Sequence, residues 1–193
     1  MIYFTSDTHF GHANIIKYCS RPFSSVEEMD STIINNWNSV VLPKDTVFHL
    51  GDFSFHPPEK NLEILLSLNG SKILIAGNHD KNFSKSSAMK GLTFKAPYYE
   101  LMFKDPSKKS GKNKIVMSHF PMEEWTDCSR GSYMLHGHCH GNLKRSEYRR
   151  LDVGVDPNNF KLLSLDEVMR VLSVKPYKSH HGAIDSSRAY PVV

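Results

Sequence analysis

The sequence has few cysteines and no long apolar run. Its three cysteines, Cys19, Cys128 and Cys139, are odd in number and widely spaced, which argues against a disulfide framework. No apolar stretch approaches the roughly 20 residues that span a bilayer, and the first residues lack the basic and apolar regions of a secretory signal peptide. We therefore expect a chain without a membrane segment that folds in a reducing cytoplasm.

A strong excess of one charge sign is also missing. The chain has 24 Lys and Arg against 20 Asp and Glu, a formal net charge of +4, which allows nucleic acid as a substrate without implying it. Hydrophobic residues at 39% and charged residues at 23% exclude disorder and fibrous repeats. The length of 193 residues predicts one domain, over residues 1–175, and the polar segment 176–193 is expected to be a C-terminal tail.

Short apolar runs in the first half predict three strands, at residues 2–6, 46–50 and 72–76, and polar residues follow each of them. The segments 25–40 and 58–68 between these strands have the apolar spacing of amphipathic helices. Strands that alternate with helices predict right-handed crossovers and a parallel sheet for this half of the chain.

The second half has a different pattern. Further strands are expected at residues 98–103, 115–118, 133–136 and 150–153. The lysine-rich segment 104–114 is interpreted as a solvated hairpin loop between the first two of these. A closing helix is predicted at 163–174, with Ser164 as its N-cap.

The polar residues at the strand ends are of types that bind metals. Ligands in an open α/β sheet collect at the carboxyl ends of the strands, so these residues are expected to converge. They are Asp7, His9, Asp52, Asn78, His79, His119 and the run His136-Gly137-His138-Cys139-His140. Oxygen ligands mixed with imidazoles suit manganese, iron, zinc or nickel better than calcium or an iron–sulfur cluster. A structural zinc site at Cys139 would need paired cysteines, which the sequence lacks.

The order of these motifs resembles the signature of the calcineurin-like metallophosphoesterase superfamily. The matching motifs are Asp7-x-His9, Gly51-Asp52, Gly77-Asn78-His79-Asp80, His119 and Gly137-His138-x-His140. They span about two thirds of the chain, and the start Asp-Thr-His-Phe-Gly-His is similar to that of short bacterial and bacteriophage members. The resemblance implies an α/β fold, a four-layer β-sandwich of two mixed sheets flanked by helices.

The resemblance also implies a site with two divalent metals. Manganese is expected in preference to iron, zinc or nickel. The implied ligands are Asp7, His9 and His140 for one metal, Asn78, His119 and His138 for the other, and Asp52 as a bridge. His79 is expected to contact the phosphate and to protonate the leaving oxygen, with Asp80 orienting His79. We also expect Asn78, His12 and Arg21 near the substrate, the last because a guanidinium suits a phosphate oxygen.

The chemistry of such a site favours a phosphohydrolase. Two divalent ions with two carboxylates leave a surplus of about +2, which selects an anion. Two metals ~3.5–4 Å apart can share a hydroxide that attacks a phosphodiester or phosphomonoester in line. An imidazole titrates in the range needed to protonate the leaving oxygen. A nucleotide is one candidate substrate.

Two alternative functions stay open at this point. A nuclease acting on DNA or RNA would share the chemistry but would need a basic groove. A scaffold that keeps the fold without turnover is the other alternative, against which the presence of His79 argues. His49 and His136 are interpreted as packing or supporting residues and His56 as a surface residue. The oligomeric state is not predicted.

Overall fold

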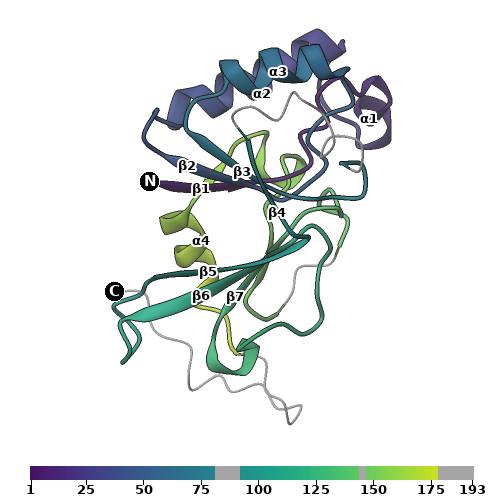
Figure 1. Ribbon diagram of the computed structural model, residues 1–193. Coiled ribbons are helices and arrows are strands. Elements are labelled where there is room, and N and C mark those ends of the chain that lie inside the picture. Colours follow the sequence, from purple (N-terminus) through teal and green to yellow (C-terminus); the bar gives the residue numbers. More distant parts are fainter. Residues whose placement is uncertain (81–91, 144–146, 178–193) are drawn as a thin grey trace.

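The computed structural model describes residues 1–80, 92–143 and 147–177. Two β-sheets face each other, and helices cover the outer face of one of them (Figure 1). The prediction of an α/β chain with two mixed sheets is confirmed. The predicted tail, 176–193, lies outside the described residues from position 178 on, so the domain boundary at 175 stays a prediction.

The first sheet has the strand order β4-β3-β2-β1-β9. The bounds are Ile2–Thr5 for β1, Thr46–His49 for β2, Ser71–Ile75 for β3, Leu92–Lys95 for β4 and Leu163–Ser164 for β9. The strands β1 to β3 are parallel, as predicted; β4 continues the parallel pairing, and β9 pairs antiparallel with β1. β4 and β9 add to the predicted strands, and β9 has only two residues, too few to show an alternation of apolar residues.

The second sheet has the strand order β5-β6-β7-β8. The bounds are Tyr98–Lys104 for β5, Lys112–Ser118 for β6, Tyr133–His136 for β7 and Arg150–Asp152 for β8. The predicted hairpin is formed by β5 and β6, in a register that places Tyr98 opposite Ser118. The strands β6, β7 and β8 are parallel. Loops that follow β6 and β7 therefore leave the sheet at the same end.

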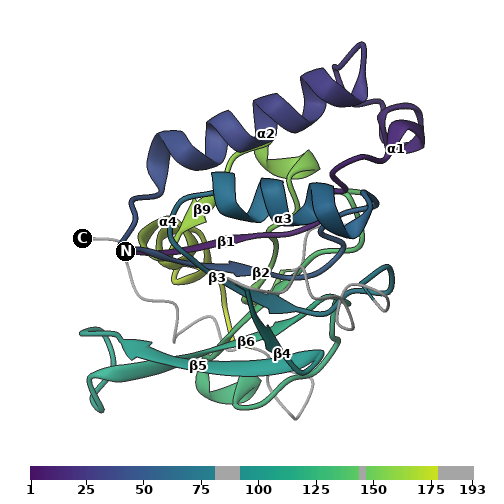
Figure 2. The same ribbon diagram turned by 45° about the horizontal axis from the view of Figure 1, so that its top comes forward.

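Helices α2 and α3 lie over the outer face of the first sheet, as Figures 1 and 2 show. Helix α2, Val26–Val40, begins at Ser25, whose hydroxyl accepts the Glu28 N–H. Helix α3 is Pro58–Ser67, with proline in its first turn. The apolar stripe that α2 buries against the sheet includes Met29, Ile33 and Trp37. Both helices match the predicted segments.

The shorter helices α1 and α4 differ more from the expectation. Helix α1, Ala13–Tyr18, buries only Ile15 and has too few apolar positions for a recognisable stripe. Helix α4, Leu165–Leu172, starts after Ser164 as predicted but ends two residues short of the predicted limit at 174. Val168 and Leu172 insert into the core between the two sheets. Helix α4 thereby closes one side of the sandwich (Figure 1).

The outer face of the second sheet is covered differently from that of the first. Val116 and Met134 pack there against Trp125 and Cys128, which come from the connection between β6 and β7. Within the described ranges, this connection contains a single turn of 3-10 helix, Cys128–Arg130, and no α-helix. The expected helical layer on this side is therefore mostly loop. None of the helices described has the length and apolarity needed to cross a membrane.

Replacement of Ser164 by alanine should lower the free energy of unfolding by about 1 kcal/mol. The Ser164 hydroxyl accepts the Glu167 N–H (3.2 Å), and the Glu167 carboxylate accepts the Ser164 N–H (2.7 Å), which is a capping box. Urea unfolding followed by circular dichroism measures the change. The control is Ser173→Ala at the other end of α4, which should stay within about 0.5 kcal/mol of the wild type. An equal loss in both variants would contradict the capping role.

Candidate metal centre

The polar loops that follow the strands converge at one edge of the sandwich, as predicted. Asp7, Asp52 and Asn78 follow β1, β2 and β3, while His119 and His138 follow β6 and β7. The contacts given below show that these five residues, which are up to 131 positions apart, surround a common point. Both sheets therefore contribute to one site.

Backbone contacts hold the loops close together. The Asp7 N–H donates to the Gly51 carbonyl (3.0 Å). Gly51 has a φ of +95°, and a Cβ there would lie 2.5 Å from the Gly77 nitrogen. A Cβ on Gly137 would overlap the Asp7 carboxylate. Glycine is needed at both positions, at Gly51 for the conformation and at Gly137 for the close approach.

The backbone is left-handed at many of the expected ligands. A positive φ occurs at Asp7 (57°), His9 (50°), Asp52 (57°), His138 (68°) and His140 (47°). Residues with a side chain rarely adopt this region, and the energetic cost of doing so is typical of functional sites. The sharp turns direct side chains from separate loops toward the same point.

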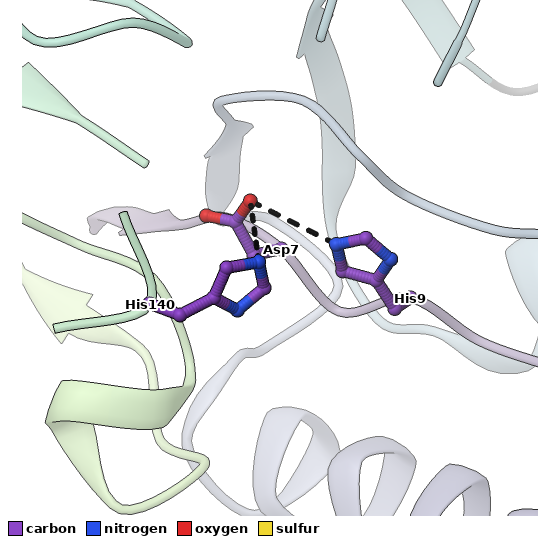
Figure 3. A group of neighbouring side chains, drawn as sticks. All are labelled: Asp7, His9 and His140. Carbon is purple, nitrogen blue, oxygen red and sulfur yellow. Dashed lines mark ion pairs between the residues drawn. The ribbon is translucent and has the colours of Figure 1, made fainter. Parts of the chain in front are cut away.

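Asp7, His9 and His140 form the first group of expected ligands (Figure 3). The Asp7 Oδ1 atom lies 4.0 Å from His9 Nε2 and 3.9 Å from His140 Nε2. Asp7 Oδ1 and His9 Nε2 are buried and have no hydrogen-bond partner. Buried polar atoms are almost always paired, so these two atoms have the arrangement of ligands around a cation.

The protonation of this group follows from its burial. Burial raises the pKa of Asp7 to about 7. Burial, together with the nearby charges of His140 and Arg21, lowers the pKa of His9 to about 2, so its ring is neutral at physiological pH. A neutral imidazole is the metal-binding form, and a bound cation would favour the charged form of the carboxylate. The residues present therefore fit a divalent metal ion.

Asp52 lies between the first group and a second one. Its Oδ2 atom is 3.6 Å from His9 Nε2 and 3.5 Å from His119 Nε2. The His119 Nδ1–H donates to the Leu50 carbonyl (2.8 Å), which leaves Nε2 with a lone pair directed at Asn78 Oδ1 (3.0 Å). Two acceptor atoms this close together also suit a cation that lies beside both of them. Asp52 is thus placed to contact ions in both groups.

His138 and His79 lie at the open side of this arrangement. The His138 N–H donates to Asp7 Oδ2 (2.9 Å), and its exposed ring is 5.1 Å from that of His119. The His79 N–H donates to Asp52 Oδ1 (3.0 Å). The side chain of His79 is 47% exposed, and its Nε2 is 3.9 Å from Asp52 Oδ2. His79 is therefore close to both metal groups and accessible to a substrate.

Asp80 has contacts that differ from the expected one with the His79 ring. Its Oδ2 accepts the N–H groups of Asp52 (2.8 Å) and Gly77 (2.7 Å), and its Oδ1 accepts that of Phe53 (3.1 Å). Burial raises the pKa of this carboxyl group. Asp80 therefore joins the loops after β2 and β3 through backbone N–H groups, which differs from the expected contact with the His79 ring.

Arg21 also differs from its expected role as a phosphate ligand. The guanidinium is buried, and its donors are directed at Asp156 (2.8 Å, twice), the carbonyls of Thr8 (3.0 Å) and Asp7 (2.8 Å), and Met29 Sδ (3.3 Å). A guanidinium has five N–H groups, so no donor is left for a substrate phosphate. The geometry therefore does not support substrate binding by Arg21.

Asp156 is a site residue that the sequence analysis does not identify. Its Oδ2 accepts the Nδ1–H of His140 (2.7 Å), while Arg21 holds the carboxylate from the other side. This leaves His140 Nε2 facing Asp7. A carboxylate behind a ligand histidine fixes the orientation of its ring. The available signal was that Asp156 follows β8, in the same way that the other site residues follow their strands.

Histidines outside the ligand set have different surroundings. His12 lies beside the site, with its Nδ1 3.3 Å from His9 Nδ1, and burial lowers its pKa. His56 is half-buried and pairs with Asp30 (2.7 Å), so its interpretation as a surface residue is wrong. Asp30 also accepts the Gly11 N–H (3.2 Å), which ties helix α2 to the loop that carries His9.

The fold and these ligand groups define the chain as a metallophosphoesterase. The model of the calcineurin-like phosphoesterase family matches residues 1–153, and the chain belongs to this family. Family membership supports a metal-dependent phosphoesterase, and the ligand clusters agree with the divalent metals typical of the family.

Similar proteins match most of the chain. An uncharacterized protein of Methanocaldococcus jannaschii is 39% identical over 180 residues, which cover 89% of this chain and 90% of that protein. The Gene 66 protein of Mycobacterium phage L5 is 29% identical over 190 residues, covering 86% and 91%. The crystal structure of a protein of unknown function from Aquifex aeolicus has a TM-score of 0.65 at 29% identity, and the match covers 89% of this chain and 99% of that one.

Replacement of Asp156 by asparagine should weaken the binding of one manganese ion about 10- to 100-fold, because His140 loses the carboxylate that orients its ring. Isothermal titration calorimetry on the metal-free protein measures the affinity. The matched control is Asp166→Asn, which changes an exposed aspartate in helix α4. If both variants bound manganese as tightly as the wild type, the orienting role would be excluded.

The stability of the metal-free protein should depend on the protonation of His49. This residue is fully buried, its Nε2–H donates to the Thr8 hydroxyl (3.0 Å), and burial lowers its pKa from 6.5 to about 3. Between these pH values the unfolded chain binds a proton at His49 that the folded protein does not, so stability falls as the pH decreases. When urea unfolding is measured with EDTA at several pH values, His49→Gln should reduce the pH dependence of the free energy of unfolding by up to about 1.4 kcal/mol per pH unit. An unchanged pH dependence would exclude His49 as a source of the stability loss at low pH.

Proposed function

We propose that this protein is a dinuclear-metal phosphohydrolase that cleaves a phosphodiester or a phosphomonoester, with manganese as the preferred metal. One observation carries the proposal. The buried atoms Asp7 Oδ1 and His9 Nε2 have no hydrogen-bond partner, and they lie beside an Asp52 carboxylate that also faces His119. Unpaired buried acceptors on one side of a shared carboxylate, with His119 Nε2 facing Asn78 Oδ1 on its other side, suit two cations better than one.

The ligand roles in this proposal follow the two groups. The ligands are Asp7, His9 and His140 for one ion, Asn78, His119 and His138 for the other, and Asp52 for both. When bound, the two ions supply positive charge to the phosphate oxygens and lower the pKa of a water molecule. The chain itself holds these groups in place, because left-handed turns, Asp80 and the Arg21–Asp156 pair leave the ligand side chains little freedom.

His79 is the proposed proton donor to the leaving oxygen. Its backbone is fixed by the bond to Asp52, while its half-exposed ring lies on the open side where a substrate enters. His12, next to His9, is the proposed further contact with a phosphate oxygen. A neutral imidazole at this position donates a hydrogen bond without neutralising the bridging carboxylate. Arg21 takes the role of a positioning residue in place of a substrate ligand.

His79→Ala should retain both manganese ions and lose on the order of 10²–10⁴ in kcat on a diester with an alkoxide leaving group. The loss should be smaller for p-nitrophenyl esters, because p-nitrophenolate leaves without a proton. Steady-state kinetics on both substrates, with metal content from elemental analysis, measure the effect. A variant that stayed fully active on the alkyl diester would contradict the proposed proton donor.

Asp52→Asn is the complementary variant, since it should lose metal and activity together. Manganese titration into the EDTA-treated variant should show weaker binding at both sites, because the shared carboxylate serves both groups. Parallel assays of bis-p-nitrophenyl phosphate and p-nitrophenyl phosphate on the wild type separate diester from monoester preference. If the manganese-loaded wild type turned over neither ester, the proposed phosphohydrolase would be wrong.

A further inference from the structure

Two phenylalanines are exposed at the mouth of the candidate metal centre. Phe55 is 41% exposed and Phe120 is 48% exposed. The ring of Phe55 lies 5.0 Å from that of His79, and the ring of Phe120 lies 4.6 Å from that of His138. Exposed apolar rings that lie together beside a charged polar site are typical of binding surfaces. The two rings border the site next to different ligand groups.

The ring of Phe55 stacks on two histidines of the site. The centroids of His9 and His12 lie 5.3 and 4.1 Å from that of Phe55, with nearly parallel planes. The two histidine rings are only 5.4 Å from each other, so both lie on the same side of the Phe55 ring. The ring of His79 is a third neighbour, tilted by 46° against that of Phe55, and Phe55 remains 41% exposed.

Phe120 has a similar position beside the second ligand group. Its ring is 5.1 Å from that of His119 and tilted by 76° against it. It directly follows His119 in the chain, so the turn after β6 directs one side chain into the site and the next to its rim. Within the part of the chain that the structure describes, Phe55 and Phe120 are the large apolar side chains that combine high exposure with ring contacts to expected metal ligands.

We propose that Phe55 and Phe120 form an aromatic rim that stacks on planar groups carried by the ester arms of the substrate. The inference rests on the proposed phosphohydrolase function and names its substrate class, which is a phosphate ester whose arms are nucleoside-like. The two phenylalanines contact histidines of different ligand groups, so a phosphate bound between these groups would lie between the two rings. Stacking of a base on an aromatic side chain strengthens binding roughly 5- to 100-fold without selecting one base.

Two substrates with the same leaving group test the rim. Thymidine 5′-(p-nitrophenyl phosphate) and methyl p-nitrophenyl phosphate have the same charge and release p-nitrophenolate, but only the first has a planar group on its other arm. The manganese-loaded wild type should prefer the thymidine ester by about tenfold or more in kcat/KM. One of the variants Phe55→Leu and Phe120→Leu, at whichever ring lies beside the thymidine arm, should reduce this preference several-fold, while Phe55→Trp should retain it.

The matched control is Met102→Ala, which removes an exposed apolar side chain from β5, away from the site, and should leave the preference unchanged. A wild type without preference for the thymidine ester would overturn the rim. So would a result in which both leucine variants lower the two esters by the same factor, because that result indicates a role limited to packing against the histidines.

Failure of the proposed function gives a different result. If the wild type hydrolysed neither ester, the rim would be tested by calorimetric binding of thymidine 5′-monophosphate and methyl phosphate to the manganese-loaded protein. Tighter binding of the nucleotide that is lost in Phe55→Leu would support the rim without the hydrolase. Equal affinity for the two phosphates would overturn it.

Discussion

The two sheets and the candidate metal centre both depend on the carboxylate of Asp7, which is fully buried at the end of β1. Its Oδ2 accepts the His138 N–H from the loop after β7, so it joins the first sheet to the second (2.9 Å). Its Oδ1 faces His9 and His140 without a hydrogen-bond partner. A buried carboxylate with an unpaired oxygen destabilises a fold, and a cation at this point would remove the penalty. Metal binding and the association of the two sheets are therefore linked through one side chain.

The general arrangement of the fold and the site can be predicted from the sequence because it depends on local patterns. Apolar runs that end on polar residues mark β1, β2 and β3, and the alternation with helical segments implies parallel pairing. The same rule places Asp7 and Asp52 together, since the carboxyl ends of parallel strands share one edge. Elements with few residues, such as α1 and β9, have no comparable pattern and become defined only by packing on the rest of the chain.

The supporting contacts of the site could not be predicted, because they join segments that are distant in the sequence. Arg21 and Asp156 are 135 positions apart, and nothing near either residue indicates the other as its partner. An arginine close to a ligand motif suggests phosphate binding, but burial beside Asp156 directs its donors into the protein. Asp80 is a similar case: its position after His79 suggests a side-chain contact, whereas the fold places backbone N–H groups around both of its oxygens.

The inner part of the site thus tolerates few substitutions, while the outer part tolerates more. In the inner part, each carboxylate oxygen either accepts a hydrogen bond or faces expected ligand atoms, and left-handed turns fix the backbone. A substitution there would leave a buried polar atom without a partner, at a cost of roughly 1–3 kcal/mol or more. Phe55 and Phe120 contact the histidines only through ring faces and edges, so they can change without unpairing any polar atom. Substrate preference is therefore most easily altered at the rim, while the phosphate-binding chemistry is preserved beneath it.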